Sequence, residues 1–206
     1  MKLVIISDTH GMFEKVHVPN GDVFIHAGDI MGRSSMFNIA YFDHWLGTLP
    51  HTHKIVIAGN HDRDFETNPK EARSRITNAI YLEDEAFEID GIKFYGSPWQ
   101  PWFLDWAFNL PRGAELKAKW DLIPEETDVL ITHGPSYGVL DQVLSGEHVG
   151  CEELAKAIAR IKPKLHIFGH IHEGYGMREV DGCTHINASI NTARYDPVNP
   201  AIVIDI

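Results

Sequence analysis

Five short runs of aspartate, asparagine and histidine share one feature, which is the kind of segment that precedes them. The runs are Asp8 with His10, Asp29, Asn60 with His61, His133, and His170 with His172. Each follows a short segment of mostly β-branched and aliphatic residues, which is typical of a buried strand. Strands whose carboxyl ends meet at one edge of a sheet would bring these oxygen and nitrogen ligands together. The pattern therefore predicts a metal site held by a rigid sheet.

The types of ligand indicate the class of metal. The candidates combine carboxylate, imidazole and amide groups: Asp8, His10, Asp29, Asn60, His133, His170 and His172. They are too many for one tetrahedral zinc ion, and neither Cys151 nor Cys183 lies among them. Mixed ligands of this kind suit a pair of divalent ions, Mn²⁺ first, with Fe, Zn²⁺ or Ni²⁺ as alternatives. Two such ions repel each other unless a carboxylate bridges them, and Asp29, directly after Gly28, is the predicted bridge.

The segments between these runs predict the elements that position the ligands. Strand patterns lie at residues 3–6, 23–26, 54–58, 129–131 and 165–168, and further ones at 86–89, 92–95, 184–187 and 201–206. Helical patterns lie at residues 34–46, 70–79, 114–120 and 152–161, and Asp90-Gly91 predicts a tight hairpin turn. Strands that alternate with helices and give way to strand-rich sequence predict an α/β fold with two sheets and helices outside them. We expect one domain over residues 1–206.

Composition and charge exclude several classes of function. A hydrophobic content of 44% and a charged content of 23% are ordinary for a globular protein. The formal net charge of −11 argues against broad nucleic-acid binding, which requires a basic face. The sequence starts on a strand pattern and has neither a secretory signal nor an apolar run that could span a bilayer. We therefore expect a cytoplasmic protein without a membrane partner.

Taken in order, the motifs resemble those of the calcineurin-like metallophosphoesterases. They are Asp8-Thr9-His10, Gly28-Asp29, Gly59-Asn60-His61-Asp62, His133-Gly134 and Gly169-His170-Ile171-His172. This resemblance implies a four-layer αββα sandwich of two mixed β-sheets flanked by helices, with the metal site at the C-terminal ends of the strands. The segments 132–135, 168–176 and 186–189 resemble, more narrowly, the Mpped branch, the metallophosphoesterase domain-containing proteins.

The resemblance also implies a role for each residue of the site. One metal would be held by Asp8, His10, Asp29 and His172, and the other by Asp29, Asn60, His133 and His170. His61 would lie beside the substrate as the catalytic residue. The phosphoprotein phosphatases of this family carry an aspartate that orients this histidine, whereas Gly32 stands at that position here. The partner of His61 is therefore open, with Asp62 as a candidate.

These assignments predict a metal-dependent phosphodiesterase acting on small phosphodiesters such as cyclic nucleotides. A hydroxide that bridges the two metals would attack phosphorus, and His61 would donate a proton to the leaving oxygen. Two alternatives remain open, a phosphomonoesterase or protein phosphatase on the same fold and a non-catalytic metal-binding scaffold. The amidohydrolases share HxH motifs, but they need a larger barrel and lack the strand end at residues 59–62.

Residues 97–106 are too aromatic and proline-rich for a regular element. Their tryptophans predict a hydrophobic cover over the core. The alternative is a wall of the substrate cleft, which makes Trp99 and Trp102 candidate substrate-binding residues. His26 and His166 lie inside apolar runs, so we interpret them as buried structural residues rather than ligands.

Overall fold

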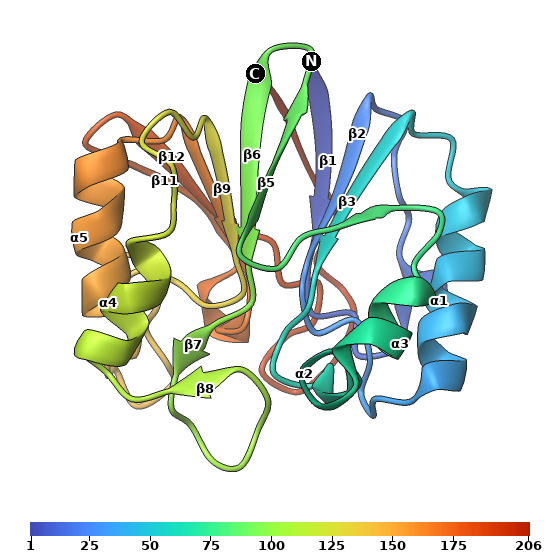
Figure 1. The fold of residues 1–206 in the computed structure, drawn as a ribbon, viewed down its shortest axis with the longest axis horizontal. Helices are drawn as coiled ribbons and strands as arrows, with labels where there is room; N and C mark the ends of the chain where they lie inside the picture. The colour runs from blue at the N-terminus through green and yellow to red at the C-terminus, as the bar shows by residue number, and fades with distance from the viewer.

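Two large β-sheets pack against each other in the computed structural model, which describes residues 1–206. Helices cover the outer face of each sheet (Figure 1). Three clusters of buried apolar residues separate the layers, one between the sheets and one under each group of helices. The arrangement is the four-layer αββα sandwich that the motifs imply. No helix is both long enough and apolar enough to cross a membrane.

The first sheet has five strands in the order β13-β1-β2-β3-β4. Their bounds are β1 (Lys2–Ile6), β2 (Val23–Ala27), β3 (His53–Ile57), β4 (Ile80–Tyr81) and β13 (Ile202–Asp205). Strands β1 to β4 run parallel, and only β13 at the edge is antiparallel. The central strands are mostly apolar because both of their faces are buried: on β1, Leu3 and Ile5 face the second sheet, while Val4 and Ile6 face the helices.

The second sheet has six strands in the order β11-β12-β10-β9-β6-β5. Their bounds are β5 (Glu85–Ile89), β6 (Ile92–Ser97), β9 (Val129–Thr132), β10 (Leu165–Phe168), β11 (Gly176–Val180) and β12 (Cys183–Asn187). The four inner strands run parallel, and the two edge strands are antiparallel. Hairpin β5–β6 turns at Asp90 and Gly91, both in the left-handed backbone region, as the sequence predicts.

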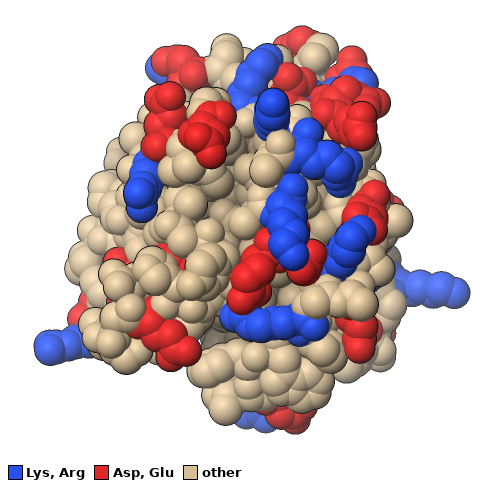
Figure 2. Space-filling view, turned by 90° about the vertical axis from the view of Figure 1, so that its left-hand side faces the viewer, with Lys and Arg blue, Asp and Glu red and all other residues tan.

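The helices fall into two groups. On the first sheet lie α1 (Met36–Thr48), α2 (Arg63–Thr67) and α3 (Pro69–Ser74), and on the second α4 (Ala114–Trp120) and α5 (Glu152–Ile161). Short 3-10 helices occupy Phe13–Lys15 and His172–Gly174. Helix α1 begins within two residues of its predicted start. The residue before it, Ser35, caps it, because the Ser35 hydroxyl accepts a hydrogen bond from the Asn38 N–H at 3.1 Å. Over α4 and α5, basic and acidic side chains are interspersed (Figure 2).

One predicted helix is wrong in its extent. The sequence predicts a helix over 70–79, but α3 ends at Ser74 and a separate helix α2 precedes it. The Asp43 carboxylate on α1 accepts the N–H groups of Thr77 and Asn78, each at 2.8 Å. This contact holds residues 77 and 78 in a turn and therefore stops the helix.

The two sheets meet at the edge where their parallel strands end. Just beyond β1, Ser7 forms a parallel bridge with Ser189, which lies just beyond β12. The Ser7 N–H donates to the Ala188 carbonyl at 2.9 Å, and the Ile190 N–H donates to the Ser7 carbonyl at 3.0 Å. The carboxyl ends of both sheets are thereby joined directly beneath the loops that carry the candidate ligands.

Candidate metal centre

The candidate ligands occupy the loops that follow β1, β2, β3, β9 and β10, as the sequence predicts. Four of them have left-handed backbone conformations: Asp8 (φ 54°), His10 (φ 45°), Asp29 (φ 52°) and His170 (φ 67°). Such φ values are uncommon for residues other than glycine, and they cluster at functional sites where the surroundings enforce them. Strained backbone at four candidate ligand positions indicates that the fold enforces the geometry of this site.

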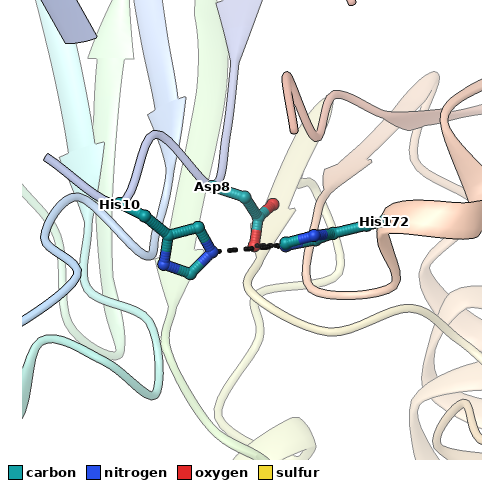
Figure 3. Close-up of side chains that lie close together, drawn as sticks. All are labelled: Asp8, His10 and His172. Carbon is teal, nitrogen blue, oxygen red and sulfur yellow. Dashed lines mark hydrogen bonds and ion pairs between the residues drawn. The ribbon is translucent and has the colours of Figure 1, made fainter. Parts of the chain in front are cut away.

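Asp8, His10 and His172 form the first group of candidate ligands (Figure 3). The Nε2 atoms of His10 and His172 lie 3.3 Å apart. The His172 Nε2 also lies 3.5 Å from the Asp8 Oδ1, and the His10 Nε2 lies 3.8 Å from the Asp29 Oδ2. Residues far apart in the sequence thus direct their donor atoms at one point.

Asp29, His133 and His170 form the second group. The His133 Nε2 lies 2.9 Å from the Asn60 Oδ1 and 3.4 Å from the Asp29 Oδ1. Asp29 thus contacts His10 with one carboxylate oxygen and His133 with the other. That position between the groups is the one a bridging carboxylate needs.

The hydrogen bonds of two histidines test whether these residues fit a cation. The Nδ1 atoms of His133 and His172 each lie 3.0 Å from a backbone carbonyl, Ala27 and Thr192 respectively. Because a carbonyl only accepts, each Nδ1 carries a proton, and each ring would present a bare Nε2 when it is neutral. The bare nitrogens face other acceptors, among them the Asn60 amide oxygen and the Asp8 carboxylate. Divalent ions between them would resolve this opposition, so the donor set fits a metal.

When no metal ion is bound, a proton on His133 offsets the negative charge of Asp29. Burial acts to lower the pKa of His133, but the Asp29 carboxylate outweighs it and raises that pKa to about 9. Burial likewise acts to raise the pKa of Asp29, and His133 holds it below the usual range instead. The site therefore attracts positive charge at its centre, and a cation bound by the His133 Nε2 would have to displace this proton.

Asp8 is held by residues that the sequence reasoning did not assign. The Ser189 hydroxyl donates to the Asp8 Oδ2 at 2.7 Å, and the Asn191 amide donates to the Asp8 carbonyl at 2.6 Å. A Cβ atom at Gly169 would overlap the Asp8 carboxylate, which explains a glycine there. Ser189 lies in a segment that the family resemblance includes, whereas Asn191 follows it and carries no signal of its own.

His61 lies at the edge of the ligand groups, within 4.8 Å of His10 and Asp29 by its donor atom. Its backbone N–H donates to the Asp29 Oδ1 at 2.8 Å, and its Nδ1 lies 3.3 Å from the Gly32 carbonyl. The Trp106 ring stacks on the imidazole with centroids 4.1 Å apart. Gly32 has no side chain that could contact His61, so its backbone carbonyl makes the contact instead.

Asp62 is not the partner of His61. Its buried carboxylate makes no hydrogen bond with the imidazole and instead accepts three backbone hydrogen bonds, from Gly59 at 2.8 Å and from Ile30 and Met31 at 3.1 Å. These contacts tie the loop after β2 to the loop after β3. Asp62 thus stabilises the loops that carry Asp29 and Asn60.

A cavity of about 610 Å³ opens from the ligands, and most of its remaining wall is apolar or aromatic. That wall includes Trp102, Phe103, Leu104, Trp106, Val143, Leu144 and Tyr195. Apart from the candidate ligands, its charged residues are Arg112, Glu147 and Glu173. Arg112 is engaged, since it pairs with Glu152 at 2.6 Å and donates to the carbonyls of Val149 and Gly150.

Two tryptophans of residues 97–106 line the cavity, and the third belongs to the hydrophobic cover. Trp102 lines the cavity, and so does Trp106, which the sequence reasoning did not select as a site residue. Trp99 lies outside it and packs against both outer apolar clusters. The Trp99 Nε1 donates to Asp84 at 2.9 Å, and the Lys119 ammonium lies 4.1 Å from its ring centroid. Trp99 is therefore part of the hydrophobic cover.

Residues 1–174 match the family model for the calcineurin-like phosphoesterases. The chain belongs to this family. The calcineurin-like phosphoesterases are hydrolases, so the chain is a metal-dependent phosphoesterase, and the sequence-based prediction at this level is confirmed.

A sequence relative indicates the branch of the family, and solved structures show the fold. The chain is 45% identical to human metallophosphoesterase domain-containing protein 1, an alignment that covers 100% of this chain and 71% of the human protein. The predicted likeness to the Mpped branch is therefore confirmed. A solved crystal structure, 17% identical, covers 90% of this chain and 89% of its own with a TM-score of 0.71. A structure from Thermus thermophilus, 15% identical, covers 90% and 88% with a TM-score of 0.63. At these identities the two structures show the fold alone.

Proposed function

We propose that this calcineurin-like phosphoesterase hydrolyses small organic phosphodiesters, cyclic nucleotides among them, with two divalent ions, Mn²⁺ first. Residues 1–206 would act as one metallophosphoesterase domain. The observation that carries the proposal is the cavity beside the ligands, whose wall is largely aromatic and aliphatic. A phosphodiester has an organic group on each side of phosphorus, and such a wall suits organic groups.

The charges of the cavity favour a diester over a monoester. A phosphodiester carries one negative charge, whereas a phosphomonoester carries close to two at neutral pH. The basic residue in the wall, Arg112, is already paired with Glu152, and Glu147 and Glu173 would repel a further anionic group. Binding of phosphate charge would thus depend on the metal centre, which suits the monoanionic diester.

We divide the candidate donor atoms into two sets that share Asp29. We assign Asp8, His10, Asp29 and His172 to one ion, and Asp29, Asn60, His133 and His170 to the other. When bound, a pair of divalent ions supplies charge that neutralises phosphoryl oxygens and lowers the pKa of water. Carboxylate, imidazole and amide donors suit Mn²⁺, with Fe, Zn²⁺ and Ni²⁺ as alternatives.

His61 is the proposed general acid. Its Nδ1 is next to the Gly32 carbonyl, which can only accept, so this nitrogen keeps its proton and leaves the Nε2 for the cavity. The stacked Trp106 ring holds the imidazole in this orientation. From there the Nε2–H would donate a proton to the oxygen of the departing alcohol.

Trp102 is expected to bind the organic group of aromatic substrates. Stacking of a base on an aromatic side chain is worth about 1–3 kcal/mol in nucleic-acid sites. We expect Trp102→Ala to raise KM for a cyclic nucleotide by roughly 5- to 100-fold, and to leave KM for a small aliphatic phosphodiester nearly unchanged. Trp99→Ala is the matched control, because Trp99 lies outside the cavity and should affect the melting temperature instead. Equal changes in KM for both substrates in Trp102→Ala would show that Trp102 has a structural role rather than a substrate-binding one.

Two esters with one leaving group test the proposed function. The protein is loaded with Mn²⁺ and assayed with bis(p-nitrophenyl) phosphate and with p-nitrophenyl phosphate. We expect kcat/KM to be at least about tenfold higher for the diester, with loss of activity in EDTA and recovery on adding Mn²⁺. A preference for the monoester would support the phosphomonoesterase alternative. Full metal loading without turnover of these or other phosphoesters would support the non-catalytic scaffold.

A further inference from the structure

A buried histidine of the first sheet braces two of the ligand loops from behind. His26 on β2 is fully buried, and its Nε2 lies 2.9 Å from the Thr9 Oγ1. The Thr9 hydroxyl also lies 2.9 Å from the Ile30 carbonyl. The ring packs against Phe42 of α1, with centroids 5.4 Å apart, so it lies on the side of the sheet that the helices cover. His26 therefore does not line the cavity. Through the Thr9 hydroxyl, however, it is linked to both the loop after β1 and the loop after β2.

The second sheet repeats this arrangement. His166 on β10 is fully buried, and its Nε2 lies 2.8 Å from the Oγ1 of Thr132, the last residue of β9. The Thr132 hydroxyl lies 2.7 Å from the Gly134 carbonyl. In each sheet, then, a histidine on one strand contacts a threonine at or just beyond the end of the neighbouring strand, and that threonine contacts a loop carbonyl.

The direction of each hydrogen bond follows from counting protons. A threonine hydroxyl has one proton, and a carbonyl can only accept. Since the Thr9 hydroxyl donates to Ile30, the His26 Nε2 must carry a proton and donate to Thr9. The other tautomer would place an N–H on the His26 Nδ1, which is buried without a partner, and orphaned buried N–H groups are rare. Burial lowers the pKa of His26 to about 3, so its ring is neutral.

The same counting fixes a longer chain in the second sheet. The Thr132 hydroxyl donates to Gly134, so the His166 Nε2 donates to Thr132. The unprotonated His166 Nδ1 then accepts from the Nδ1 of His185, which lies 3.1 Å away. Burial lowers the pKa of both rings, that of His185 to about 4, which keeps the chain neutral.

Both chains end on the backbone around candidate ligands. Thr9 stands between Asp8 and His10, and Ile30 follows Asp29; the three candidate ligands among them have left-handed backbones. A non-glycine residue in that region is strained and persists only where its surroundings enforce it. In the second sheet, the bond from Thr132 to the Gly134 carbonyl spans His133 and fixes the backbone that carries its ring.

We propose that His26 and His166 are positioning residues for the metal centre, each donating from Nε2 through a threonine hydroxyl to hold the ligand loops in their metal-binding conformation. This inference rests on the ligand assignment under the proposed function. It assigns to two core histidines an effect on metal affinity that simple packing would not give them.

Metal titration of His26 variants tests the inference. Mn²⁺ binding is measured by calorimetry for wild type, His26→Leu, which removes the donor, and His26→Gln, whose amide N–H replaces the Nε2–H. Groups that orient metal ligands typically contribute 10- to 100-fold to affinity. We expect His26→Leu to weaken Mn²⁺ binding by about that factor and His26→Gln to recover most of it. His51→Leu is the matched control, because His51 is a buried histidine that packs against Phe24 of β2 and meets the loop after β1 only near Pro19, away from Asp8 and His10.

Two results would overturn the inference. One is wild-type Mn²⁺ affinity in His26→Leu, and the other is an affinity in His26→Gln as low as in His26→Leu. If His26→Leu does not fold, nitrogen-15 NMR of wild-type histidines decides, because the inference requires the Nε2–H tautomer at both His26 and His166 and fails if either is Nδ1–H. A wild-type protein that binds no Mn²⁺ would instead refute the ligand assignment on which the inference rests, while the NMR result would still report on the hydrogen bonds.

Discussion

Replacing Asp29 with asparagine is expected to weaken the binding of both divalent ions together, by at least about 10²-fold, since even groups that only orient a ligand contribute roughly 10- to 100-fold. Asp29 contacts His10 of one ligand group with its Oδ2 and His133 of the other with its Oδ1. Asparagine keeps the size of the side chain and an oxygen that can accept the His61 N–H. It removes the charge that offsets repulsion between the ions. The measurement is calorimetric titration of the metal-free protein with Mn²⁺.

Asp43→Asn is the matched control for that substitution. Asp43 is also a buried carboxylate, but it accepts hydrogen bonds from Thr77 and Asn78, away from the ligands. Its loss should lower the free energy of unfolding by about 1–3 kcal/mol and leave Mn²⁺ affinity unchanged. Loss of a single ion in Asp29→Asn, with the other bound as in wild type, would show that Asp29 does not bridge.

His61→Ala is expected to slow hydrolysis according to the leaving group. A ribose oxygen leaves poorly without a proton, so loss of a general acid should lower kcat for a cyclic nucleotide by about 10²- to 10⁴-fold. A p-nitrophenolate leaves without help, so bis(p-nitrophenyl) phosphate should be affected much less. Single-turnover rates on both substrates, with metal content measured in the same samples, give the comparison.

His133→Ala is the contrasting variant, because the His133 Nε2 lies among the oxygens of Asn60 and Asp29. It should lose metal and slow both substrates alike, whereas His61→Ala should keep its metal. The geometry also allows His61 to be a ligand, since its donor atom lies within 4.8 Å of those of His10 and Asp29. Equal slowing of both leaving groups in His61→Ala, with full metal and chemistry rate-limiting, would contradict the general-acid role.

The convergence of the candidate ligands was predictable because it depends on strand direction. Five apolar segments ending in polar residues become parallel strands, and parallel neighbours place their carboxyl ends at one edge. Alternation does not reveal an exposed edge strand such as β11, which carries Arg178 and Glu179 on an exposed stretch and was missed. Asp181 and Gly182, both with positive φ, are the turn signal that could have indicated it.

Details set by distant contacts were not predictable from local pattern. The end of α3 depends on Asp43, which lies in another helix. The contact of His61 with Gly32 uses a backbone carbonyl, which leaves no trace in residue type. Which tryptophan faces the cavity depends on the pairing of β7 (Gln100–Pro101) with β8 (Asn109–Leu110), and two-residue strands carry too little pattern to predict.

The metal content of the wild-type protein tests most directly whether the centre holds two ions. The protein is stripped with chelator, reconstituted with excess Mn²⁺, freed of unbound ion and analysed for manganese per chain. The donor sets that share Asp29 predict two Mn²⁺ ions per chain. A single fully occupied ion would contradict the binuclear centre and the bridging role of Asp29.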